Sequence, residues 1–169
     1  LLEGFFLSLN FQKTIYENTW KPRETALQSF EKMLSESKLG IIGYGRIGKK
    51  LTNYLNSFGA KCYFFDPYIK KYNKNKITKI INLKDLFNLC EVVSINCYLT
   101  KETNQMINYK LLKLLKRNSI LINTARGEIV NEKHLIKILK ERSDIYVSLD
   151  VLDNEQSDIK KNLLFKKSL

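Results

Sequence analysis

Cysteine and histidine are scarce in this chain, and their scarcity excludes several kinds of site. Only three cysteines occur among the 169 residues, at Cys62, Cys90 and Cys97, and they form no CxxC pair. With a single histidine, His134, the chain has no His/Cys cluster that would bind zinc. Nor do three cysteines make the framework of a disulfide-rich secreted protein. We therefore expect no metal site and a reduced, cytoplasmic setting.

A long apolar run is also missing. The apolar opening, residues 1–7, is far shorter than the roughly 20 residues that span a bilayer, and no basic stretch precedes it. We expect a helix there, neither a signal peptide nor a membrane anchor. The length suits one domain with a single core, without internal repeats. Because the first residue is not Met, we expect the chain to be a piece of a longer protein.

Acidic residues are few beside basic ones, 17 against 29, which gives a net charge of +12. Clustered Lys and Arg would favour nucleic acid, because they release counterions from a phosphate backbone. Here the positive residues are mostly scattered lysines, as in Lys70-Lys71 and Lys160-Lys161, with no nucleic-acid-binding motif beside them. We therefore interpret the excess as solvated charge on helix faces. Nucleic-acid binding through charge alone stays a minor hypothesis.

Strands and helices are expected to alternate after residue 36. The predicted helices are 47–58, 83–89, 108–115 and 131–142, and the predicted strands are 38–43, 61–66, 92–96, 119–123 and 145–150, with a short apolar segment at 77–81. In the first helix, the residues expected on one face are Ile47, Leu51, Leu55 and Phe58. Such alternation predicts right-handed crossovers and a parallel sheet covered on both faces.

Three glycines, Gly43, Gly45 and Gly48, stand where the first strand ends and a helix begins. In the pattern GxGxxG the first allows a tight turn, the second lets a pyrophosphate approach, and the third lets helix and strand pack closely. Asp66 ends the next strand, where a carboxylate can accept hydrogen bonds from the adenosine ribose and repel a 2′-phosphate. Alternatively, Asp66 is only a turn residue before Pro67. The pattern favours an α/β Rossmann fold, a doubly wound parallel sheet, that binds NAD.

Polar residues follow the remaining predicted strands. They are Asn96-Cys97, Thr124-Ala125-Arg126-Gly127 and Asp150. Because ligands of doubly wound sheets bind at the carboxyl ends of the strands, we expect these residues on one edge with the glycines. The planar charged fork of Arg126 suits a small carboxylate substrate, unless it pairs with Asp150 as a structural arginine.

Two further residues have uncertain chemistry on sequence alone. Glu155 lies in the loop after Asp150, where it would either raise the pKa of a neighbouring His or be a solvated loop acid. His134 lies within a predicted helix, away from the strand ends. We expect it on the helix surface, with no part in catalysis.

Together these motifs resemble the NAD-binding domain of the D-isomer-specific 2-hydroxyacid dehydrogenases. That family includes phosphoglycerate, D-lactate and glycerate dehydrogenases and, more distantly, formate and phosphite dehydrogenases. The stretches that carry the resemblance are LGIIGYGRIG (39–48), DPY (66–68), VVSINC (92–97), LTKET (99–103), INTARG (122–127) and LDV (149–151). The resemblance implies an NAD-binding domain over residues 37–155 of an oxidoreductase that transfers hydride between NAD(H) and a 2-hydroxy or 2-keto acid.

The resemblance also implies a role for each matched position on the cofactor side. Arg46 and Ile47 would meet the pyrophosphate, beside the glycine turn. Asp66 would bind the adenosine ribose. Cys97 and Tyr98 would form part of the wall around the cofactor.

On the catalytic side, Thr124, Ala125 and Arg126 would lie beside the nicotinamide. Arg126 would also grip the carboxylate and carbonyl of the substrate. Asp150 would bind the nicotinamide amide, and Glu155 would be the acid that partners the catalytic His. The expected catalytic residues of this chain are therefore Arg126 and Glu155.

Several parts of the family pattern differ or are missing. Tyr98 and Gln156 stand where the family usually has Pro. The catalytic His, which in the family follows Glu155, and the substrate domain are absent from the chain. We expect a fragment of a longer enzyme that is inactive alone; the alternative is a non-enzymatic NAD-binding or redox-sensing module, similar to the C-terminal-binding corepressors.

The family also dimerises through this domain. We accordingly expect a homodimer in which the helical segment 1–36, with Phe5, Phe6 and Trp20, is a possible arm. Residues 156–169 are expected to be a tail that begins a truncated return to the missing domain.

Overall fold

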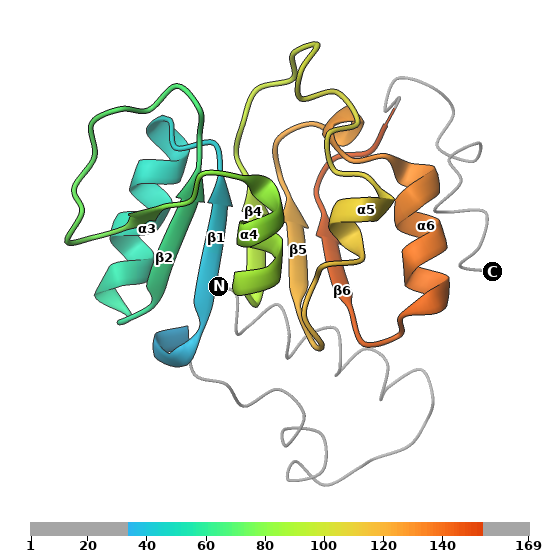
Figure 1. Cartoon of the computed structure of the whole chain (residues 1–169), viewed down its shortest axis with the longest axis horizontal. Helices are drawn as coiled ribbons and strands as arrows, with labels where there is room; N and C mark the ends of the chain where they lie inside the picture. Colours follow the sequence, from blue (N-terminus) through green and yellow to red (C-terminus); the bar gives the residue numbers. More distant parts are fainter. Residues whose placement is uncertain (1–33, 154–169) are drawn as a thin grey trace, which may run out of the picture. The chain divides into compact units, whose positions relative to one another are not determined.

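A six-stranded parallel sheet forms the centre of the computed structural model, which describes residues 34–153 (Figure 1). The strands are β1 (Lys38–Ile42), β2 (Lys61–Phe65), β3 (Thr78–Lys79), β4 (Val92–Ile95), β5 (Ile120–Asn123) and β6 (Tyr146–Leu149). Their order is β3-β2-β1-β4-β5-β6, so the winding reverses between β1 and β4. This confirms the predicted Rossmann arrangement. The segment at 77–81, predicted only as a short apolar stretch, supplies the edge strand β3.

One short helical segment precedes β1, and the others connect the strands. They are η1 (Leu34–Glu36), α3 (Arg46–Ser57), α4 (Leu83–Leu89), α5 (Tyr109–Leu112), η2 (Gly127–Ile129) and α6 (Glu132–Glu141). All predicted helices after residue 36 are present, although α5 is shorter than expected. No helix in the described part of the chain is long and apolar enough to cross a membrane. Of the predictions, most of segment 1–36, Glu155 and the tail 156–169 lie outside the described residues.

The sheet is packed on both faces. A Cβ built on Gly40 would lie 2.6 Å from Leu86 of α4, whereas one built on Gly48 of α3 would lie 3.2 Å from Ile41. Gly40 and Ile41 are neighbours in β1 and point to opposite faces. Thus α3 covers one face, while α4 packs on the other with α5 and α6 around one apolar core.

The buried face of α3 matches the prediction only in part, since Leu55 is buried as expected. Ile47 and Phe58, expected on the packed face, are 65% and 66% exposed, and the buried residues of the helix are Gly48, Thr52 and Leu55. At the start of the helix Gly48 accounts for the difference, because a Cβ there would stand 2.4 Å from the carbonyl oxygen of Gly43. So close an approach leaves no space for a large side chain beside Gly48, and the neighbouring Ile47 points outward. Phe58 is the C-cap residue at the other end of the helix, and this contact does not explain its exposure.

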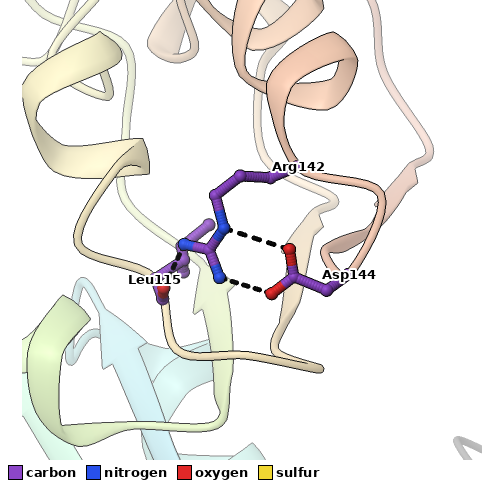
Figure 2. A network of polar contacts seen from close by, with 3 residues as sticks. All are labelled: Leu115, Arg142 and Asp144. Atoms are coloured by element: carbon purple, nitrogen blue, oxygen red, sulfur yellow. Dashed lines mark hydrogen bonds and ion pairs between the residues drawn. The ribbon is translucent and has the colours of Figure 1, made fainter.

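At the amino end of the sheet, a charged network joins the turn before β5 to the turn before β6. The Arg142 guanidinium donates through Nε and Nη2 to both carboxylate oxygens of Asp144, and through Nη1 to the carbonyl oxygen of Leu115 (Figure 2). Asn118 donates its N–H to the Asp144 carbonyl at 2.9 Å. This network ties the two loops together far from the strand ends predicted to bind the ligand.

Candidate functional site

Five neighbouring strands end on one line across the sheet. Their last residues pair in register, in the order Phe65, Ile42, Ile95, Asn123 and Leu149. The residues that follow them are Asp66, Gly43, Asn96, Thr124 and Asp150. These therefore lie side by side at the carboxyl edge, across four interstrand spacings or about 19 Å. The predicted convergence of polar residues on one edge is confirmed.

The three glycines of the turn meet three different spatial demands. Gly43 has φ +89°, and a Cβ there would lie 2.7 Å from the backbone nitrogen of Cys97. Gly48 packs against Gly43, as described above. In contrast, a Cβ on Gly45 would have no atom of the described residues within 4 Å. Two glycines are thus required by the fold, while Gly45 borders open space that a ligand can approach.

The amino end of α3 lacks the cap that the other helices have. Asn82, Asn108 and Asn131 cap α4, α5 and α6 by accepting hydrogen bonds from backbone N–H groups of the first turn. At α3 the N-cap is Gly45, with no side-chain cap and no acidic residue in the first turn. Uncapped N–H groups and the positive end of the helix dipole suit an anionic group. The backbone here fits the pyrophosphate of a dinucleotide.

Asp66 holds the glycine turn in place. Its Oδ2 accepts the N–H of Tyr44 at 2.9 Å, and its Oδ1 accepts the N–H of Tyr68 at 2.9 Å. The turn role proposed as the alternative is therefore real. It does not compete with ligand binding, because each carboxylate oxygen can accept more than one hydrogen bond. Asp66 is half-buried, so ribose hydroxyls could still reach it.

The loop after β4 begins with Cys97 and Tyr98. Cys97 is half-buried, and burial raises the pKa of its thiol, so that it offers an uncharged surface. Tyr98 is 89% exposed. Although Tyr98 replaces the usual Pro, the loop is held in another way: the hydroxyl of Thr103 donates to the Tyr98 carbonyl at 2.7 Å.

Asn123 shapes the turn that carries Thr124, Ala125 and Arg126. Its buried side chain donates to the Arg126 carbonyl at 2.8 Å and accepts the Ala125 N–H at 3.1 Å. Its own carbonyl accepts the N–H of Asp150 at 3.0 Å. Asn123 thus links the loops after β5 and β6. Sequence reasoning gave it no role, although a polar residue ending an apolar strand was a usable signal.

Arg126 is exposed, and its guanidinium donates to the carbonyl oxygen of the adjacent Ala125 at 2.6 Å. Among residues 34–153, no ion pair involves Arg126, so the proposed structural pairing with Asp150 is not formed. Asp150 is itself exposed at the edge of the sheet. The positive fork of Arg126 is therefore available to an anionic ligand.

His134 lies on α6, as predicted, but it is half-buried rather than on the surface. Its Nδ1 is buried and has no hydrogen-bond partner among residues 34–153, and its ring centroid lies 6.4 Å from that of Tyr109. These contacts belong to the packing of α6 against α5. Within the described residues, no group of three or more His, Cys, Asp or Glu residues is arranged to hold a metal ion.

Comparison with protein-family models matches residues 8–168 to the D-isomer specific 2-hydroxyacid dehydrogenase, NAD binding domain. The chain belongs to this family. NAD is accordingly the cofactor of the domain, in agreement with the glycine turn and the register of the strand ends. This confirms the resemblance inferred from the motifs.

Individual relatives agree with the family. A glyoxylate reductase of Thermococcus litoralis is 39% identical over 123 residues, which are 72% of this chain and 37% of the relative. The NAD+-bound 3-phosphoglycerate dehydrogenase of Entamoeba histolytica superposes with a TM-score of 0.67 at 35% identity, covering 76% of this chain and 40% of that one. A D-lactate dehydrogenase of Aquifex aeolicus, complexed with NAD and lactic acid, gives a TM-score of 0.76 at 29% identity, covering 95% and 46%. The chain thus spans less than half the length of these relatives.

Proposed function

We propose that this chain is the cofactor-binding part of an NAD-dependent D-2-hydroxyacid dehydrogenase. The observation that carries the proposal is the line of strand ends, on which the glycine turn, Asp66, Arg126 and Asp150 share one edge. Bound NAD would supply the hydride acceptor. The comparisons give no support to a non-enzymatic module.

The roles of the residues follow from what each can offer. The uncapped start of α3, with Arg46 and Ile47, would hold the pyrophosphate, and Asp66 would accept hydrogen bonds from the adenosine ribose. Cys97 and Tyr98 would flank the cofactor.

The residues after β5 and β6 would serve the reacting half of the site. Thr124 and Ala125 would lie beside the nicotinamide, and Asp150 would bind its amide. Arg126 would bind the carboxylate and carbonyl of a 2-keto or 2-hydroxy acid through its two-pronged fork. Glu155, outside the described residues, would partner a catalytic His of the complete enzyme.

Calorimetric titrations of the chain with NADH and with NADPH test the cofactor site. We expect NADH to bind at least about tenfold more tightly, because the Asp66 carboxylate repels a 2′-phosphate. Asp66→Ala should weaken NADH binding and reduce the preference for NADH over NADPH. Glu36→Ala, which removes an exposed carboxylate elsewhere, should change neither the affinity nor the preference. A preference for NADPH would refute the role of Asp66.

Activity requires a separate test with the complete gene product. We expect it to oxidise or reduce at least one of a panel of 2-hydroxy and 2-keto acids with NAD(H). If it binds NADH but turns over none of them, the non-enzymatic alternative becomes the better explanation.

Free cysteines at Cys62, Cys90 and Cys97 are consistent with the cytoplasmic setting that we also propose.

A homodimer is part of the proposal. Tyr54 of α3 and Phe58, the C-cap residue of that helix, are four positions apart and are 56% and 66% exposed, which leaves an apolar patch for a second copy to cover. Sedimentation should give a dimer that Phe58→Lys weakens, while Ile81→Lys, at an even more exposed apolar residue outside this helix, should leave the dimer intact. A monomeric wild-type chain would contradict this part.

A further inference from the structure

The chain after β6 passes directly over Gly127, the residue that follows Arg126. A Cβ on Gly127 would lie 2.0 Å from the carbonyl carbon of Leu152 and 2.3 Å from the backbone nitrogen of Asp153. No side chain fits into that gap. Glycine is needed here because two backbones touch, which presses the loop after β6 against the turn that carries Arg126.

A carboxylate holds the far end of the same loop. Glu132, the first residue of α6, accepts the N–H of Asp153 on its Oε1 at 2.9 Å, across 21 residues of sequence. A hydrogen bond to an ionised acceptor is stronger than one between neutral groups. The start of α6 is already capped by Asn131, whose side chain accepts the N–H of His134 at 3.0 Å. The contact of Glu132 with the loop is therefore additional to helix capping.

Both ends of the loop are thus fixed. At Asp150 the backbone N–H donates to the carbonyl of Asn123, and at Asp153 it donates to Glu132. Between them Leu152 rests on Gly127. The loop connects the edge residue Asp150 to the chain that continues toward Glu155.

We propose that Glu132 is a positioning residue for the nicotinamide half of the site. By holding Asp153 it keeps the loop 150–153 on Gly127, so that Asp150 stays in line with Arg126. This inference rests on the proposed function, in which Asp150 meets the nicotinamide and Asp66 the adenosine. Loosening the loop 150–153 should then weaken only the contacts with the nicotinamide, because Asp66 and the glycine turn are separate from this loop.

Two ligands separate the halves of the site: NADH, and ADP-ribose, which lacks the nicotinamide. In calorimetric titrations of the chain, Glu132→Ala should raise the Kd for NADH about five- to tenfold, as expected for loss of a charged hydrogen bond, and leave the Kd for ADP-ribose within about twofold. Hydrogen exchange at the Asp153 amide should become faster in the same variant.

A conservative variant and a matched control complete the design. Glu132→Gln retains an oxygen that can accept the Asp153 N–H, so this variant should keep most of the NADH affinity. If Glu132 acted only through its negative charge, Glu132→Gln would bind NADH as weakly as Glu132→Ala. Glu141→Ala removes an acid from the other end of α6 and should leave both ligands unaffected.

The outcomes separate the inference from the function on which it rests. If Glu132→Ala weakens the binding of NADH and of ADP-ribose equally, the positioning role is overturned. It is also overturned if NADH binding is unchanged although hydrogen exchange at the Asp153 amide is faster. In both cases the wild-type chain still binds NADH, and the proposed function stands. A wild-type chain that binds neither ligand would overturn both.

Discussion

The two ends of the sheet treat charge in opposite ways. At the amino end, charged side chains pair with one another. Arg142 forms an ion pair with Asp144, and Glu91 accepts hydrogen bonds from Lys116 Nζ at 3.0 Å and from the backbone N–H of Lys38 at 2.7 Å. At the carboxyl end, Arg126 has no carboxylate partner among residues 34–153. Charges that pair stabilise the fold, whereas a charge held only by backbone is available for a ligand.

The backbone shows the same division within the glycine turn. Gly48 is required by packing, while Gly45 faces open space. The first therefore belongs to the fold and the second to the ligand. Substitutions at the two positions should separate stability from binding.

The largest effect is expected for Gly48→Val. Its side chain would collide with the Gly43 carbonyl and with Ile41, and we expect a loss of about 3 kcal/mol in the free energy of unfolding, measured by urea denaturation, with NADH binding lost as the turn opens. Gly45→Ala should change the free energy of unfolding by no more than about 0.5 kcal/mol but still weaken the binding of NADH. If Gly45→Ala binds NADH like the wild type, the space beside Gly45 is not where the pyrophosphate lies.

Loss of the paired arginine should have the next largest effect on stability. Arg142→Gln removes three hydrogen bonds, two of them to a carboxylate, and should lower the free energy of unfolding by about 2 kcal/mol without changing the Kd for NADH. Arg126→Gln is the matched change at the other end. It should alter stability by less than about 0.5 kcal/mol, and should reduce the catalytic efficiency of the complete enzyme about 100-fold. Equal losses of stability in the two variants would remove the distinction between the ends.

Sequence patterns predicted the carboxyl end better than the amino end. The glycine turn, Asp66 and the strand ends follow from local signals, because a parallel sheet brings the ends of its strands together whatever its other details. The contacts of Arg142 with Leu115, and of Glu132 with Asp153, join residues more than 20 positions apart, and no local pattern indicates them.

The exposed face of α3 could not be predicted for a different reason. Apolar periodicity identifies the face with large apolar side chains, and it assumes that this face is buried. In α3 the close approach at Gly48 excludes a large side chain at the start of the buried face, so Ile47 points outward, whereas Leu55 farther along is buried as predicted. The two-residue strand β3 is likewise too short to show an alternating pattern.

The smallest expected effect concerns pH. Hydrogen bonds from Arg142 hold the pKa of the Asp144 carboxyl below its usual value of 3.8. A lowered pKa in the folded state means that the pair stabilises the fold above pH 3.8 and that this contribution is lost as the pH falls through the lowered pKa. Asp144→Asn should therefore be less stable than the wild type at pH 7, by about 1 kcal/mol or less because the pair is partly solvated. The difference should be smaller at pH 3 than at pH 7 in urea denaturation series, because below pH 3.8 the unfolded chain takes up a proton at Asp144 before the folded chain does. If the difference is the same at both pH values, the carboxylate charge is not what holds the two loops at the amino end together.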